Sequence, residues 1–141
     1  MAAADLNTIR ATIESRLVTE LSKSPPIPVV FYNQAFQPTA SSSWVQCLTS
    51  FGASEYLGHG LSANSRNLIV GLVVFNIFSA KGVGPAPNYV IGKRIRDLYN
   101  RVNVSGVFFD APIGPQALAK PEAEGYFQTQ VRVTFESIEE L

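Results

Sequence analysis

The stretch from Asn67 to Ala80 limits the possible folds more than any other part of the chain. Along a β-strand its side chains point alternately to two faces, and here both sets are mainly apolar: Leu68, Val70, Leu72 and Val74 on one face, and Ile69, Val73, Phe75 and Ile77 on the other. A strand that is apolar on both faces is covered on both faces. We therefore expect a central strand over residues 67–80, with helices on one face and another layer or a second subunit on the other.

Two amphipathic helices are predicted, one before and one after this strand. The first spans residues 5–23, because apolar residues recur at spacings of three and four and Asp5 stands at the N-cap position. The second spans residues 88–102, with Asn88 as its N-cap after the glycine- and proline-rich turn Lys81–Pro87. The remaining face of each helix is charged, and we interpret that of the first helix as solvated or partner-facing.

The other predicted strands cover residues 28–32, 44–51, 104–110 and 126–137. In the last strand the alternation places Phe127, Val131, Val133 and Phe135 inward and Gln128, Gln130, Arg132, Thr134 and Glu136 outward. The segments 52–66 and 111–125 are rich in breaker residues and are predicted as loops. The order α-β-β-β-α-β-β predicts a single α+β domain over residues 1–141, with a mostly antiparallel sheet and both helices packed on one face.

The residues that usually carry catalysis are sparse. His59 is the single histidine and Cys47 the single cysteine, and they stand twelve positions apart. A metal centre needs several clustered ligands, and a catalytic histidine needs a nucleophile motif such as Gly-x-Ser-x-Gly, which the sequence lacks. We expect Cys47 to be an unreactive buried thiol. The sequence therefore predicts no enzyme, no metal and no cofactor.

Charge favours self-association. The chain has 11 basic and 11 acidic residues and a formal net charge of zero, which removes the simplest argument for a free nucleic-acid binder. Two sets of opposite charge are candidate subunit interfaces: Lys93, Arg94, Arg96 and Arg101 on the second helix, and Glu136, Glu139 and Glu140 at the acidic end. On charge pattern alone, two ordinary solvated faces are the alternative.

Neither a targeting signal nor a membrane span is predicted. The first residues show no basic segment followed by an apolar stretch, so we expect no signal peptide. The longest apolar run, Leu68–Phe75, is far shorter than the about 20 residues that a membrane helix needs. We expect a soluble protein.

Several segments together resemble the tail terminator proteins of tailed bacteriophages. The resemblance lies in the glycine-rich segment Gly58–Arg66, the strand Leu68–Phe78, the turn Lys81–Pro87 and the helix Ile91–Tyr99. Phe78, Gly82 and Gly84 fit the family's pattern of a strand that ends in phenylalanine before a glycine turn. The segment Phe31–Pro38 is similar to the family's first strand and the turn behind it.

This resemblance implies a structural role in the virion tail or neck, with assembly in the host bacterial cytoplasm. Tail terminators form a ring, commonly of six subunits, on the last ring of the tail tube. The ring stops tube growth and joins the tail to the head connector, and genomic DNA passes through it without sequence-specific binding. The implied partners are therefore further copies of the chain, the tail tube protein and the connector. A closed ring also requires two different complementary surfaces on each subunit.

The predicted loop 52–66 is a second candidate interface. It displays Tyr56, Leu57, His59, Leu61 and Arg66 between glycines. Apolar and aromatic residues are costly to expose without a partner, and tyrosine is a frequent interface anchor. We expect this loop to dock on the tail tube or on a neighbouring subunit; the alternative is that it folds back over its own sheet.

Two other functions stay open on the sequence. One is another virion protein, in the neck, in head completion or in the tail tube, which the state of assembly would separate from a terminator. The other is a small ligand-binding or hydrolytic α+β domain in which His59 supplies the polar group. That domain would show a thermal shift with a small molecule, and His59→Ala would give a phenotype without loss of assembly.

Overall fold

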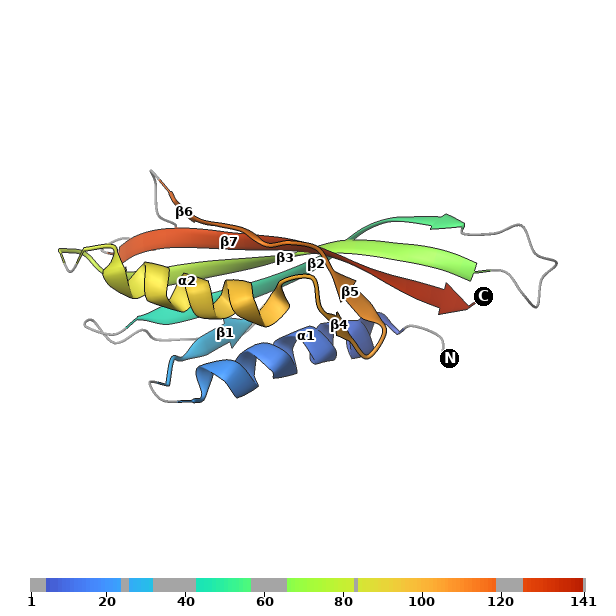
Figure 1. Cartoon of the computed structure of the whole chain (residues 1–141), viewed down its shortest axis with the longest axis horizontal. Coiled ribbons are helices and arrows are strands. Elements are labelled where there is room, and N and C mark those ends of the chain that lie inside the picture. The colour runs from blue at the N-terminus through green and yellow to red at the C-terminus, as the bar shows by residue number, and fades with distance from the viewer. Residues whose placement is uncertain are drawn as a thin grey trace.

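The computed structural model describes residues 5–23, 26–31, 43–56, 66–82, 84–118 and 126–140, and these contain two helices and seven strands (Figure 1). The two long strands β3 and β7 form the centre of the sheet. In chain order the elements are α1 (Leu6–Leu21), β1 (Val29–Phe31), β2 (Trp44–Tyr56), β3 (Arg66–Ala80), α2 (Ala86–Tyr99), β4 (Asn103–Val104), β5 (Val107–Phe109), β6 (Ile113–Ala117) and β7 (Tyr126–Glu140).

The strands form one mixed sheet in the order β1-β2-β3-β7-β5-β4, and β6 also pairs with β7. β3 and β7 run antiparallel from the pair Arg66 and Glu140 to the pair Ala80 and Tyr126. The short β1 is parallel to β2, and every other described pairing is antiparallel. The predicted single α+β domain with a mostly antiparallel sheet is therefore confirmed.

The predicted arrangement of a plain sheet with helices layered on one face does not describe its shape. The sheet curls, and β1 and β4, the two ends of its strand order, both approach α1 (Figure 1). Half-buried residues from these two ends, Val29 and Val104 among them, pack on the same core as the buried face of α1. Long strands twist and coil, so the ends of such a sheet leave its mean plane.

The apolar stripe of α1 is buried as predicted. Ile9, Ile13, Leu17 and Leu21 are each at most 3% exposed. Asp5 caps the helix, because its side chain accepts a hydrogen bond from the Asn7 N–H at 3.4 Å. These residues share one core with the sheet and α2, and in that core the Phe75 and Tyr99 rings stack with centroids 5.1 Å apart.

Three hydrogen bonds from long side chains connect α1 and α2. Arg16 Nε donates to the Leu98 carbonyl at 3.0 Å, and Arg94 Nη2 donates to the Glu20 carbonyl at 2.7 Å. The buried Tyr99 hydroxyl donates to the Ile13 carbonyl at 2.7 Å. Residue numbers rise along one helix as they fall along the other, so the helices are antiparallel. Each arginine therefore binds a carbonyl in the last turn of the other helix, where the helix dipole is negative.

The start of α2 differs from the prediction. The helix begins at Ala86 with Pro85 as its N-cap, and Asn88, the predicted cap, lies inside the helix and is fully buried. Its side-chain amide accepts from the Ser79 hydroxyl and donates to the Ile77 carbonyl at 2.9 Å. Asparagine is common at helix caps because its side chain binds nearby backbone groups. Here the side chain of Asn88 forms its hydrogen bonds with residues near the ends of two strands instead.

Three strand predictions were wrong in extent. β2 continues to Tyr56, so residues 52–56 are strand and not loop, and residues 104–110 contain the β4–β5 hairpin and not one strand. Within the predicted loop 111–125 lies β6, which pairs with β7 through an irregular register that accommodates Pro115. Pairing with a neighbouring strand outweighs the low strand propensity of glycine and proline at these places.

The sheet face away from the helices contains a buried group of amides. Asn76 Nδ2 donates to Gln46 Oε1 at 3.1 Å, and Asn76 Oδ1 accepts from Gln128 Nε2 at 2.9 Å and from Gln130 Nε2 at 3.0 Å. Asn76 is 1% exposed and Gln128 is fully buried, so Gln128 lies on the predicted outward face but is not exposed to solvent. Alternation identified the correct face, but this part of that face is not open to water.

Candidate functional site

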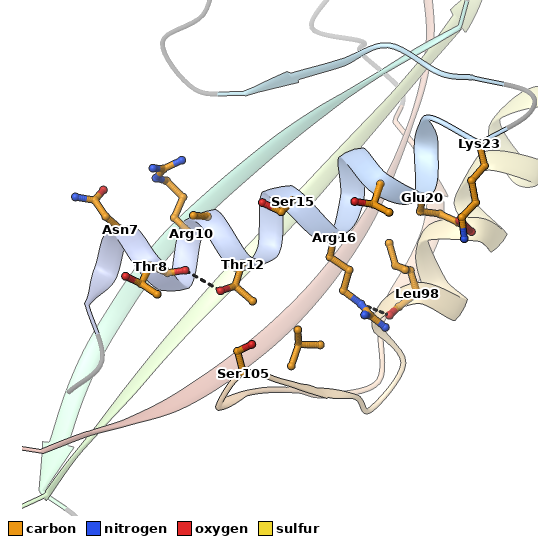
Figure 2. Close-up of a pocket in the computed structure, with 13 residues that line it drawn as sticks. Asn7, Thr8, Arg10, Thr12, Ser15, Arg16, Glu20, Lys23, Leu98 and Ser105 are labelled. Carbon is orange, nitrogen blue, oxygen red and sulfur yellow. Dashed lines mark hydrogen bonds and ion pairs between the residues drawn. The ribbon is translucent and has the colours of Figure 1, made fainter. Parts of the chain in front are cut away.

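A groove of about 830 Å³ runs along the side of α1 that faces away from the core (Figure 2). α1 supplies most of its lining. Leu98 from the last turn of α2 and Val104 and Ser105 from the β4–β5 hairpin complete it. The groove therefore exists only because the curled sheet brings the β4–β5 hairpin beside α1.

Hydroxyl groups line the groove at regular intervals. Thr8, Thr12, Ser15 and Thr19 stand at spacings of four, three and four, which places them on one side of the helix. Thr12 Oγ1 donates to the Thr8 carbonyl at 2.8 Å, as Figure 2 shows. Small side chains on this stripe leave room for another chain segment, and their oxygens can donate or accept hydrogen bonds.

Arg16 lies across the groove toward α2 (Figure 2). Its Nε is fixed on the Leu98 carbonyl, and the side chain is half-buried. No described residue accepts a hydrogen bond from either Nη atom of Arg16. A guanidinium presents five donors in a planar fork, so Arg16 can hold Leu98 and still bind a carboxylate or a phosphate.

Two further cations line the groove. Arg10 forms an ion pair with Glu14 at 2.7 Å, and Lys23 forms one with Glu20 at 3.3 Å. Both of these cations are therefore matched by a carboxylate of α1, and Arg16 is the lining cation without a carboxylate partner among the described residues. The groove therefore favours an anionic or acceptor-rich partner.

The predicted basic surface of α2 is largely engaged within the chain. Arg94 binds the Glu20 carbonyl, and Arg96 donates through Nη1 to the Gly114 carbonyl of β6. Lys93 forms an exposed ion pair with Asp97 at 2.8 Å. Arg101 is exposed, and its Nη1 lies 3.5 Å from the Asn100 side-chain oxygen. Arg94 and Arg96 thus stabilise the fold, which sequence spacing could not reveal.

The acidic end (Glu136, Glu139 and Glu140) belongs to the last residues of β7. Glu136 is exposed and follows the buried Phe135, so it lies on the sheet face away from the helices. In register it stands opposite Phe108 of β5, which is 40% exposed. The structure therefore does not bring Glu136 and the groove together within one chain: they lie on opposite faces.

The predicted docking loop is only partly described. Tyr56 is the last residue of β2 and Arg66 the first of β3, and Tyr56 pairs with Asn67, so both ends of the predicted loop are strand. Leu57, His59 and Leu61 lie outside the described residues. Docking through this segment stays a prediction.

Two buried groups have strongly perturbed acidity. Burial raises the pKa of the Cys47 thiol, and nearby Glu14 raises it further. Burial also raises the pKa of Tyr99, and the hydroxyl of Tyr99 is held by the Ile13 carbonyl. Thiolates are the reactive form of cysteine, so the prediction of a buried and unreactive Cys47 agrees with its place in β2.

Within the described part of the chain, no three histidine, cysteine, aspartate or glutamate side chains gather as metal ligands would. Neither of the described helices is long and apolar enough to cross a membrane.

No family model and no curated protein matches the sequence. The fold has solved counterparts. One of them, whose name states no function, is 16% identical, covers 94% of this chain and 95% of its own, and superposes with a TM-score of 0.70. At 16% identity the comparison shows a shared fold, and it does so over nearly the whole chain.

The groove was missed by the sequence analysis. The spacing of Thr8, Thr12, Ser15 and Thr19 was a visible signal of a polar stripe on one side of the first helix. The other wall was not predictable, because Leu98 and Ser105 reach the groove only through tertiary packing.

Proposed function

We propose that this chain is a tail terminator of a tailed bacteriophage: a structural protein whose copies form a ring that caps the tail tube and joins it to the head. The proposal starts from the resemblance carried by the glycine-rich segment, the central strand, the glycine turn and the second helix. In the folded chain the central strand, the glycine turn and the second helix are consecutive parts of one unit. β3 occupies the middle of the sheet, Phe78 at its end is buried, and the turn with Gly82 and Gly84 leads into α2.

The observation that carries the proposal is the placement of unlike surfaces on opposite faces of one small subunit. The basic groove lies on the helical side, and Glu136 with Phe108 lies on the other side of the sheet. Surfaces that differ and lie apart suit a head-to-tail contact, which generates a ring when its rotation closes. They do not suit a two-fold dimer made through a single self-complementary patch.

A ring of this kind acts by geometry and not by chemistry. Its closed set of lateral contacts leaves two axial surfaces, one for the last ring of the tube and one for the head connector. Growth stops because the axial surface away from the tube does not accept another tube subunit. DNA passes through the central opening, where tight phosphate binding would hinder its release.

Electron microscopy of the concentrated pure protein tests the proposal. We expect closed rings with an open centre and one rotational symmetry. Long stacked tubes would assign the chain to the tail tube instead. A protein that forms no rings alone is then mixed with unfinished tails: a terminator binds their growing ends and stops elongation, whereas tails that elongate as before would contradict the proposal.

A further inference from the structure

We propose that the groove along α1 receives the acidic end of β7 from a second copy of the chain. This inference rests on the proposed ring-forming function and names the contact that would join neighbouring subunits. It replaces a contact between the two predicted charged sets, because two of the four cations of the predicted basic set, Arg94 and Arg96, are bound to main-chain carbonyls of their own chain.

Charge is the first argument. Arg10 and Lys23 are paired with Glu14 and Glu20, whereas Arg16 presents its Nη atoms in the groove with no described acceptor. The acidic end supplies three carboxylates within five residues of sequence, from Glu136 to Glu140. A carboxylate matches both the planar fork of a guanidinium and the donors of neighbouring hydroxyl groups.

Apolar complementarity is the second argument. The exposed Phe108 stands opposite Glu136 in the sheet register, so an aromatic ring and a carboxylate form one small patch. The groove likewise combines its cations with apolar lining from Ala11, Leu98 and Val104. Aromatic residues flanked by charged groups are frequent anchors of protein interfaces.

Topology is the third argument. Phe135 is buried in the core shared with the helices, so Glu136 faces the opposite side of the sheet. The groove lies on the helical side of the sheet, between α1, the last turn of α2 and the β4–β5 hairpin (Figure 2). The two surfaces therefore lie on opposite faces of the sheet within one chain, and they can meet only between copies.

Exchanged charges provide the experiment. One variant reverses the groove by Arg10→Glu and Lys23→Glu, and leaves Arg16 in place because it also binds α2. A second variant reverses the acidic end by Glu136→Lys, Glu139→Lys and Glu140→Lys. A third carries both sets. Self-association of the full chain is measured by sedimentation velocity over a range of concentrations, and folding is checked by thermal unfolding.

We expect wild type to self-associate and each single set to weaken association by roughly tenfold or more. The third variant, and an equimolar mixture of the first two, should regain association, because every contact then again joins opposite charges. The matched control is Lys81→Glu with Lys93→Glu, which makes the same change in net charge at two exposed lysines outside the groove. It should associate like wild type.

Several results would overturn the inference: a wild type that stays monomeric at the highest concentration, single sets that associate normally, or no recovery on combining them. If wild type bound short duplex DNA and only the groove variant lost that binding, the groove cations would be assigned to phosphate. This result would also overturn the inference. Rings that survive the charge reversals would reject this contact and leave the proposed function standing. Charge-dependent association into filaments without rings would support this contact and contradict the proposed function.

Discussion

A single amide side chain connects three elements at the end of the central strands. Asn88 of α2 accepts from Ser79 in β3, and its Nδ2 lies 2.9 Å from the Ile77 carbonyl and 3.3 Å from the Phe127 carbonyl of β7. Asn88 and Ser79 are buried, so removing the amide deprives the Ser79 hydroxyl of this partner in a place closed to bulk water. The cost of such orphaned atoms exceeds the net gain from forming the bond.

Replacing Asn88 by alanine should therefore lower the free energy of unfolding by about 3 kcal/mol. Urea denaturation measures the loss. The matched control is Asn103→Ala at an exposed position in β4, which should change stability by less than about 0.5 kcal/mol. Equal effects of the two substitutions would show that the amide contributes no specific connection.

Gly71 is a second residue at which a substitution should lower stability, because neighbouring atoms approach its Cα closely. A Cβ at this position would lie 2.6 Å from the Ser50 carbonyl oxygen and would overlap the Phe135 ring, which lies over the glycine. At Gly52 the nearest atom to a new Cβ is 3.5 Å away, an ordinary contact. We expect Gly71→Ala to cost about 1–3 kcal/mol and Gly52→Ala to cost far less. Thermal unfolding of both variants tests this, and similar melting temperatures would contradict it.

The buried acids Cys47 and Tyr99 predict a loss of stability in alkaline solution. Both have a pKa raised by burial in the folded chain. Below the pKa values of the unfolded chain, about 8.5 for cysteine and about 10 for tyrosine, both states keep their protons. Above those values the unfolded chain releases protons that the native chain retains, so stability falls as the pH rises.

Tyr99→Phe should flatten the part of this decline above about pH 10, and should also cost about 1 kcal/mol at neutral pH through loss of the bond to the Ile13 carbonyl. Urea denaturation at several alkaline pH values measures both effects. Tyr89→Phe, at a tyrosine that is 46% exposed, is the control and should leave the slope unchanged. A Tyr99→Phe profile parallel to that of wild type above pH 10 would contradict the assignment.

At the scale of elements, α1 and α2 are joined by two arginines, one from each helix, which each bind a carbonyl of the other helix. Arg16 of α1 binds the Leu98 carbonyl, and Arg94 of α2 binds the Glu20 carbonyl. Both carbonyls lie in a last helical turn, and that of Glu20 also accepts from the Lys23 N–H at 3.2 Å. The two arginines therefore satisfy helix ends while they fix the antiparallel packing.

Arg94→Met should cost about 1–2 kcal/mol, because methionine keeps much of the aliphatic packing and removes the charged donor. Lys93→Met, one residue earlier, removes only an exposed pair with Asp97 and should cost less than about 0.5 kcal/mol. Thermal denaturation distinguishes the two. If the lysine variant were the less stable, the role given to Arg94 would be wrong. This result also bears on assembly, since a reversal of Arg94 would change folding as well as any interface.

Elements with a strong periodic pattern were predictable from the sequence. The stripe Ile9, Ile13, Leu17 and Leu21 predicted α1, and the two apolar sets of residues 67–80 predicted the central strand. β6 was not predictable, because Ile113–Ala117 contains glycine and proline and is a strand only through its pairing with β7. The groove and the engaged arginines of α2 were missed for the same reason: each depends on contacts between distant segments.

At the scale of the whole molecule, the proposed contact between the groove and the acidic end makes assembly sensitive to salt. Charges near a surface are screened over about 10 Å at 0.1 M salt and over about 3 Å at 1 M. We expect self-association to weaken by roughly tenfold between these two conditions. Sedimentation velocity at both salt concentrations measures the change. Association that strengthens with salt would indicate an interface held by apolar burial instead.

The buried amides on the outer sheet face have a consequence for strand alignment. A slip of β7 by two residues against β3 would keep every apolar side chain on its present face, so apolar packing opposes that error only weakly. It would leave only one glutamine beside Asn76, with Tyr126 or Arg132 in the place of the other, and would unpair buried amides. The hydrogen bonds of Asn76 thus fix the register of two fifteen-residue strands. That register in turn sets the position of both strand ends, including the end that carries Glu136.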